Sequence, residues 1–282
     1  MQPSITCVVD NAVKSSSHLW GEHGLAFWVE TESGPVLLDT GQSGAVLLHN
    51  LDELHLDASR LKALALSHAH YDHTGGLPAL AGRLTPGLPL YANSDLLQER
   101  FSQSTGQRRA IGLSVLADWL AAHFDVHLDD APQQVLPGVW TTGAITERPY
   151  PGGYVPRQEI RAGDGYAPDP YRDDLSLVVE SDSGLIVLCG CCHAGLLNTL
   201  EHVQRVFRRH VVAVAGGTHL ISADAATLQL VAQKLTEWGG LQRLYLNHCS
   251  GQEAYFTLRQ ALGGAIVRPC PAGAVLEWAT LA

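Results

Sequence analysis

The feature that most constrains this chain is a cluster of three histidines and one aspartate within six residues, at His68, His70, Asp72 and His73. The cluster follows residues 61–67, an apolar run that is typical of a buried strand. Side chains two residues apart in an extended strand point to the same face, so His68 and His70 are expected to project together. Asp72 and His73 then lie where the chain turns into a loop or the start of a helix.

The donors in this cluster suit a metal ion. Imidazole and carboxylate groups are common ligands of Zn, Mn and Fe, and four of them can serve two ions at once. The competing interpretation is a set of surface or helix-capping histidines. Imidazoles packed this closely would disfavour one another's protonation, so that interpretation gives no reason for the spacing. The cluster therefore predicts a metal centre.

The composition fits an ordinary α/β protein of one large domain or two small ones. The chain has 282 residues, of which 46% are hydrophobic and 16% charged, and this is enough for a sizeable core. The net charge of −10 argues against broad binding to nucleic acid, which depends on clustered Lys and Arg. No apolar run approaches the 18 residues of a membrane helix, so no membrane span is expected.

The cytoplasm is the location expected from the sequence. The first residues lack the basic start and apolar stretch of a secretory signal. The six cysteines include only one CxxC spacing, Cys189 to Cys192, whereas a zinc ribbon needs two. They therefore predict neither a disulfide framework nor a structural zinc ribbon, and a reducing compartment is expected.

Short strands and helices alternate along most of the chain. Strands are predicted at residues 5–9, 25–30, 36–38, 61–67, 88–92, 139–142, 175–180, 185–188, 211–215, 244–247 and 274–278, and helices at 45–51, 198–207, 223–237 and 252–262. The middle differs. Residues 95–122 are expected to be helical in parts, and residues 150–173, rich in Gly, Pro and Tyr, to form a long loop. Loops of that length often act as lids over a site.

Several side chains of this middle segment are candidates for substrate contact. Guanidinium groups suit bidentate phosphate contacts, and the alternative is a solvated surface. Tyrosine rings can stack on a planar group such as a pterin or simply anchor the loop. The candidates are Arg100, Arg108, Arg109, Arg157, Arg161, Tyr150, Tyr154 and Tyr166.

The histidine run resembles the HxHxDH motif of the metallo-β-lactamase superfamily, and the segment LLDTG around Asp39 is similar to that family's first motif. The resemblance spans nearly the whole chain. It implies a four-layer αββα sandwich of the α/β class with the metal ions at one edge of the sheets, and an Asp39 that orients metal ligands from behind them. We accordingly expect a single domain of this fold over residues 1–282, with an inserted, lid-like helical and loop segment around residues 95–173.

A narrower resemblance points to a subfamily that includes archaeal dihydropterin ribofuranosylaminobenzene phosphate synthases. The matching segments are VVDN (8–11), GEHGLAF (21–27), HAHYDHTGGL (68–77), GCCHAG (190–195), GGTHL (216–220) and NHCSG (247–251). This resemblance implies further ligands in the second half of the chain. His68, His70 and His193 would hold the first metal, and Asp72, His73 and His248 the second.

The sequence departs from the superfamily pattern at one place. Most members carry a metal-bridging Asp in a GD dipeptide after a strand, whereas this chain has Gly190-Cys191-Cys192-His193. Either Cys191 or His193 takes the place of that Asp, or the bridge is water alone. His219 is a further candidate ligand or substrate contact. Asn11, Glu22 and His23 belong to the matching segments and are candidate pocket residues, although ordinary turn chemistry accounts for Asn11 equally well.

The cofactors predicted are two divalent metal ions, with Zn expected first and Mn or Fe as alternatives. The main hypothesis is a metallo-hydrolase in which a metal-bound hydroxide attacks an ester, lactone or phosphoester, with Asp72 steering the released proton. Two alternatives remain: a pterin-related synthase or transferase, and an iron-dependent redox enzyme. The partner expected is a small molecule, phosphorylated or pterin-like, and not a nucleic acid or a membrane. A homo-oligomer is left open.

Overall fold

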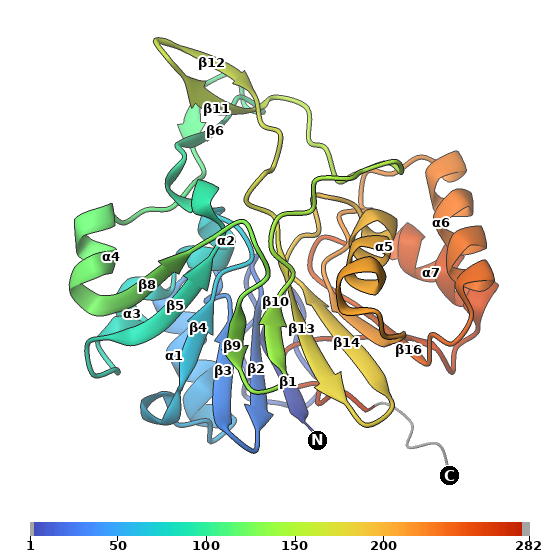
Figure 1. The fold of residues 1–282 in the computed structure, drawn as a ribbon, viewed down its shortest axis with the longest axis horizontal. Helices are drawn as coiled ribbons and strands as arrows, with labels where there is room; N and C mark the ends of the chain where they lie inside the picture. The colour runs from blue at the N-terminus through green and yellow to red at the C-terminus, as the bar shows by residue number, and fades with distance from the viewer. Residues whose placement is uncertain (1–2, 278–282) are drawn as a thin grey trace.

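Two mixed β-sheets pack face to face in the computed structural model, which describes residues 3–277 (Figure 1). The six-stranded sheet runs in the order β1 (Ser4–Val9), β2 (Ala26–Thr31), β3 (Gly34–Leu38), β4 (Ala63–Ala65), β5 (Leu88–Ala92) and β8 (Phe124–Leu128). The seven-stranded sheet runs in the order β17 (Val267–Pro269), β16 (Arg243–Leu246), β15 (Val211–Gly216), β14 (Gly184–Cys189), β13 (Ser176–Ser181), β10 (Val139–Thr141) and β9 (Gln134–Leu136).

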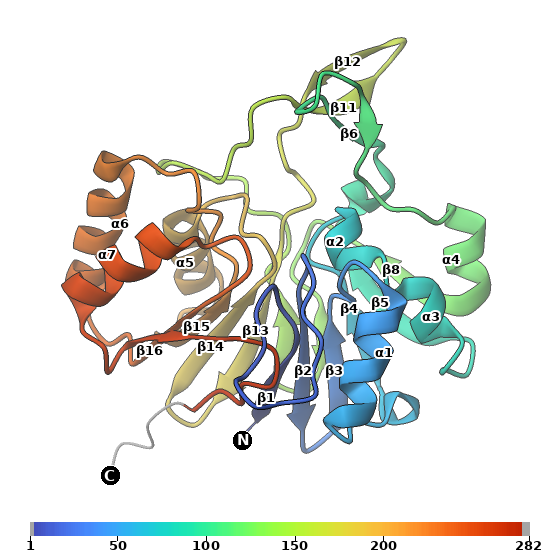
Figure 2. The same cartoon turned by 180° about the vertical axis from the view of Figure 1, so that it is seen from behind.

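Helices cover the outer face of each sheet. The six-stranded sheet is covered by α1 (Gly44–Glu53), α3 (Leu77–Ala81) and α4 (Ala117–His123), and the seven-stranded sheet by α5 (Leu196–Phe207), α6 (Ala225–Trp238) and α7 (Gln252–Leu262) (Figures 1 and 2). The alternation along β14 accounts for the layering. Ile186 and Leu188 lie in the core between the sheets, whereas Leu185 and Val187 pack under the helices, as side chains of period two require. The four-layer αββα sandwich predicted from the sequence is confirmed.

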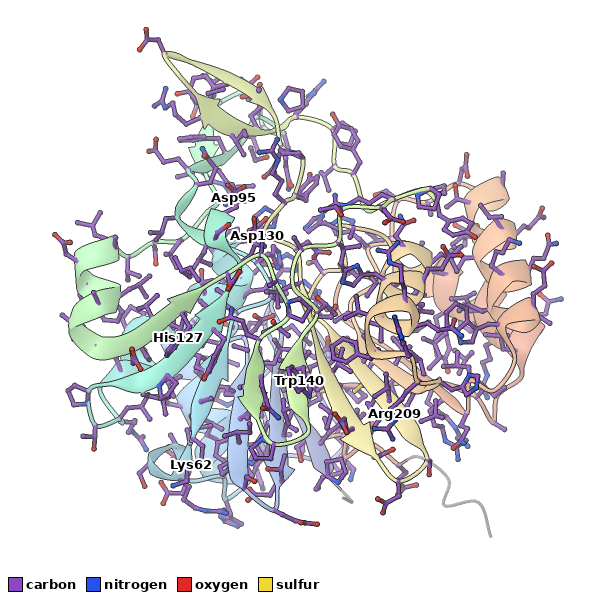
Figure 3. All side chains as sticks on the ribbon, in the orientation of Figure 1. Lys62, Asp95, His127, Asp130, Trp140 and Arg209 are labelled. Atoms are coloured by element: carbon purple, nitrogen blue, oxygen red, sulfur yellow. The ribbon has the colours of Figure 1, made fainter. Side chains whose placement is uncertain are left out.

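The middle segment forms a small third sheet that projects from the sandwich (Figures 1 and 2). Its strands are β12 (Gly165–Pro168), β11 (Gln158–Ala162), β6 (Arg100–Ser102) and β7 (Arg109–Ala110). Helical parts occur here as expected, in the short 3-10 helix η2 (Ser94–Leu97) and α4, but the strands were not predicted, and β11 and β12 interrupt the expected long loop. We call residues 100–110 and 158–168 the projecting sheet. Asp95, labelled in Figure 3, lies at its base.

Two further differences lie near the edges of the sheets. The strand predicted at 274–278 is only an isolated bridge between Thr6 and Val275, and Trp278 lies outside the described residues. The last strand is instead β17, which pairs in parallel with β16. The strands β8 and β9 were also missed. They are short and half-buried, so their apolar pattern is weak.

Parallel pairing sets the position of the candidate site. β3 and β4 are parallel, and so are β14, β15 and β16. The carboxyl ends of parallel strands meet at one edge of a sheet, where α/β folds commonly place ligands. Asp39, His68, His193, His219 and His248 all follow such ends. The short helix α2 (Tyr71–Thr74) marks this edge below the projecting sheet (Figure 1). Within residues 3–277, no helix is long and apolar enough to cross a membrane.

Candidate metal centre

Asp39 fixes the loop that carries the histidine run. Its carboxylate accepts hydrogen bonds from the backbone N–H and the hydroxyl of Ser67, each at 2.7 Å, and lies 2.7 Å from Nδ1 of His73. The residue is fully buried, and its φ of 59° is in the left-handed region, which Asp tolerates better than most residues. One carboxylate thus positions both the start of the loop and one of its imidazoles.

The first donor set consists of His68, His70 and His193, whose ring nitrogens lie within 4.8 Å of one another. All three side chains are buried, and Nε2 of both His70 and His193 has no hydrogen-bond partner. Burial, reinforced by the neighbouring imidazoles, holds the pKa of His68 and His193 well below the usual range and lowers that of His70 to about 3. Neutral imidazoles with buried, unused lone pairs fit a metal ion, because an unpaired buried polar atom is otherwise costly.

Two residues of the long loop fix the orientation of the His193 ring. Its Nδ1 lies 2.8 Å from the carbonyl oxygen of Gly153, so Nδ1–H donates there and leaves the Nε2 lone pair free. The ring of Tyr171 stacks on the imidazole at 4.1 Å between centroids and 3° between planes. The long loop therefore helps to hold the first donor set.

The second donor set consists of Asp72, His73, Cys191 and His248, again within 4.8 Å of one another. Sγ of Cys191 lies 3.2 Å from Nε2 of His73 and 3.3 Å from Nε2 of His248, and the two imidazole nitrogens are 3.2 Å apart. Tetrahedral zinc with bonds of 2.0–2.3 Å separates its ligand atoms by about 3.3–3.8 Å. The distances therefore suit one shared ion.

Charge in the second set also favours a cation. Burial alone would raise the pKa of Asp72, but the imidazoles of His73 and His248 hold it well below its ordinary value. Burial opposes protonation of His73, yet Asp39 and Asp72 raise its pKa to about 9. The same negative field that holds a proton on His73 would attract a metal ion in its place.

The comparisons with known proteins agree with this geometry. The family model of the metallo-beta-lactamase superfamily matches residues 19–184. This chain belongs to that superfamily. It is 27% identical over 256 residues to the 7,8-dihydropterin-6-methyl-4-(beta-D-ribofuranosyl)-aminobenzene-5'-phosphate synthase of Methanocaldococcus jannaschii, covering 85% of this chain and 84% of that protein.

Solved structures support the fold. The crystal structure of Tm1679, a metal-dependent hydrolase of the β-lactamase superfamily, aligns over 98% of this chain and 99% of its own with a TM-score of 0.82 and 24% identity. Zn²⁺-bound PqqB from Methylobacterium extorquens aligns over 97% and 99% with a TM-score of 0.60 and 12% identity. At these identities the likeness concerns the fold alone.

The two residues considered for the place of a metal-bridging Asp fall in different donor sets. Of the two residues proposed for that place, Cys191 contacts His73 and His248, whereas His193 falls in the first set. Asn11 lies behind the second set, because its Oδ1 accepts a hydrogen bond from Nδ1–H of His248 at 2.9 Å.

His219 lies at the candidate metal centre, where it belongs to a third donor set with Cys191 and Cys249. Cys249, which stands next to His248, was not among the candidate ligands predicted from the sequence. His23 was expected only to shape the pocket. His23 is half-exposed, and its Nε2 lies 3.2 Å from Oδ2 of Asp72. The signal for His23 was its place in the segment GEHGLAF.

The middle arginines divide into paired and unpaired groups. Arg100 is buried and contacts Asp169 at 3.2 Å and Asp173 at 2.8 Å, so neither phosphate clamping nor a solvated surface describes it. Arg108 pairs with Glu159, and Arg161 with Glu99. Arg109 and Arg157 make no ion pair within residues 3–277, and the guanidinium of Arg109 lies 5.4 Å from the ring centroid of Tyr71.

The three predicted tyrosines lie apart from the donor sets. Tyr150 donates its hydroxyl to Glu201, and Tyr166 lies against the guanidinium of Arg108 in the projecting sheet. Tyr154 is exposed. The tyrosine that contacts the centre is Tyr171, which was not selected from the sequence.

Proposed function

We propose that the chain is a metal-dependent hydrolase that holds two divalent metal ions, zinc first, and acts on a small ester, lactone or phosphoester. The observation that carries the proposal is the pair of buried, unpartnered Nε2 atoms of His70 and His193 beside a second set of donors that includes a carboxylate and a thiol. His68, His70 and His193 would hold one ion, and Asp72, His73, Cys191 and His248 the other. When bound, such ions lower the pKa of water from 15.7 towards about 7 and so make a nucleophile available at neutral pH.

The chain's own residues would then handle the proton and the solvent. Asp72 would steer the proton released in the reaction. The half-exposed His23, 3.2 Å away, offers that proton a route to water. Asp39 and Asn11 hold the rings of His73 and His248 from behind, so that Nε2 of each ring faces the centre.

The substrate would bind beside His219. A cavity of about 270 Å³ is lined by Gly153, Tyr154, Thr218 and His219, among others. This volume suits part of a small molecule. We also propose that the middle segment, including the projecting sheet, acts as a lid. Arg100 ties β6 to Asp173, and Asp173 accepts the backbone N–H of Ala69 between the first two histidines of the run.

Replacement of both His68 and His70 with alanine tests the assignment. Metal content and hydrolysis of a phosphodiester, lactone and ester panel should fall together, because the first donor set loses two of its three nitrogens. A matched variant, His127→Ala with His210→Ala, removes two imidazoles that belong to none of the donor sets and should retain both properties. His127 is labelled in Figure 3 on the outer strand β8. Activity that survived loss of the metal would overturn the proposal.

A second candidate is favoured by the similarity to the Methanocaldococcus jannaschii synthase. The chain would then join a 7,8-dihydropterin that carries a leaving group on its 6-methyl carbon to a β-D-ribofuranosylaminobenzene phosphate, with loss of that leaving group and of a proton, instead of hydrolysing a bond. Incubation with these two compounds, followed by mass analysis of products, separates the candidates. Metal analysis of the purified protein separates both from a redox enzyme, because iron together with oxygen consumption would support the latter.

A further inference from the structure

Three strand ends bring a set of sulfur and nitrogen donors together beside the second donor set. Cys191 follows β14, His219 follows β15 and Cys249 follows β16, and their ligand atoms lie within 4.8 Å of one another. Both thiols are buried, whereas His219 is partly exposed. The sulfur of Cys191 thus faces two donor sets at once.

The backbone is shaped to allow this approach. A Cβ on Gly217 would lie 2.6 Å from Sγ of Cys249 and 2.4 Å from the carbonyl oxygen of Gly190, so only glycine permits this spacing. His219 has a φ of 49°, a left-handed conformation that is uncommon outside glycine, although histidine adopts it more often than most residues. Such strain is commonly stored at functional sites.

Apart from the contacts of Cys191 with His73 and His248, the three donors have few partners outside the set. Sγ of Cys249 makes a weak contact of 3.5 Å with the carbonyl oxygen of Cys191. Within residues 3–277, neither ring nitrogen of His219 makes a hydrogen bond, although its ring lies 4.4 Å from that of His193 between centroids. Another buried thiol, Cys7, differs because Asn247 donates to it and no donor set includes it.

We propose that Cys191, His219 and Cys249 form a third metal-binding position for a thiophilic divalent cation such as zinc. Two thiolates and one imidazole are three of the four ligands of a tetrahedral zinc site, and the fourth position would remain open. Two thiolates also offset the charge of a buried dication, which could not otherwise be accommodated. The inference rests on the proposed function only in that Cys191 is shared with the second donor set, as a bridging thiolate.

Metal counting with Cys249→Ser tests this position. Reduced protein is stripped with a chelator and reloaded with Zn²⁺ or Co²⁺, and bound ions are counted by elemental analysis. The wild type should bind three ions per chain and Cys249→Ser two, with a weaker thiolate-to-cobalt absorption band. The control Cys270→Ser, which removes another buried thiol outside all three donor sets, should still bind three.

A second variant, His219→Gln, keeps the test decisive if Cys249→Ser does not fold, because it should lower the count from three to two with both thiols intact. The inference is overturned if wild type and either variant bind equal numbers of ions, or if Cys191 and Cys249 form a disulfide in the reduced, metal-loaded protein. If the proposed function is wrong, a different pattern of bound ions is expected. The first two sets would then stay empty, while one ion with a thiolate band would remain and would be lost in Cys249→Ser.

Discussion

The first and second donor sets lie side by side but differ in charge and in support. The first set offers three imidazoles, all kept neutral by burial, which lowers the pKa of each. The second offers a carboxylate and a thiol besides two imidazoles. Anionic ligands offset the charge of a dication, and thiolate favours zinc over harder ions. We therefore expect the second set to hold its ion more tightly and the first set to be filled last.

The residues that hold the two donor sets in place also differ. The second set is braced by side chains of the sandwich, with Asp39 on His73 and Asn11 on His248. The first set is braced by the middle segment, through Gly153 and Tyr171 on His193 and Asp173 on the backbone of Ala69. The sandwich also reaches the first set, because the hydroxyl of Ser67, which donates to Asp39, lies 2.9 Å from Nδ1 of His68. The middle segment therefore supports the first set, whereas the sandwich supports both.

Asp72→Asn should produce the largest effect. The amide keeps the size of the side chain but removes the negative charge and the proton acceptor, so activity should fall by about 10²–10⁴-fold. The second-set ion should be lost and the first-set ion kept. Elemental analysis with activity on the same sample checks this, and His70→Gln provides the mirror-image variant. Loss of both ions from Asp72→Asn would contradict the separation of the two sets.

Asp39→Asn should have an intermediate effect that is larger on the second set, because Asp39 contacts His73 directly and reaches His68 of the first set only through Ser67. Asn tolerates the left-handed backbone that Asp39 adopts, so the change isolates the carboxylate that accepts from Ser67 and His73. Loss of such a partner typically lowers metal affinity by about 10–100-fold. Competition with a chromogenic chelator measures each ion's affinity. An equal loss from both sets would mean that Asp39 supports the whole loop instead of His73.

The sequence predicted the donors that are close in the chain better than those brought together by folding. The histidine run could be interpreted directly because imidazoles spaced so closely serve few purposes besides metal binding, and the fold followed from its resemblance to a family. Cys249 was not selected as a ligand, and His23 was expected only to shape the pocket, because their contacts come from chain segments that meet only in three dimensions.

The projecting sheet illustrates a second limit of prediction from sequence. Ser102 of β6 pairs with Gln158 of β11, which lies far away in the sequence. No local sequence pattern therefore predicts this pairing. The strands are also polar and only half-buried, which hides the alternation by which strands are usually found. Arg100 was misjudged for the same reason. Its partners, Asp169 and Asp173, lie far along the chain and bury it only after folding.

Asp173→Asn should have the smallest effect on metal binding and a measurable effect on the free energy of unfolding. Burial, which outweighs the attraction of Arg100, raises the pKa of Asp173 to about 6 from an ordinary value of 3.8. The folded carboxyl therefore keeps its proton to a higher pH than the unfolded one. Its contribution to stability is fully present below about pH 4 and is lost as the pH rises through about 6, by at most about 3 kcal/mol.

The asparagine variant should flatten that decline in the free energy of unfolding between about pH 4 and pH 6, measured by urea titration of the metal-free protein. Its amide oxygen can still accept the N–H of Ala69, so the first-set ion should weaken only a few-fold and the second-set ion not at all. Asp164→Asn, at an exposed turn of the projecting sheet, serves as the control and should keep the wild-type slope. A second-set ion that weakened as much as the first would refute the idea that the middle segment supports one half of the centre alone, because Asp173 reaches the second set only through the shared loop.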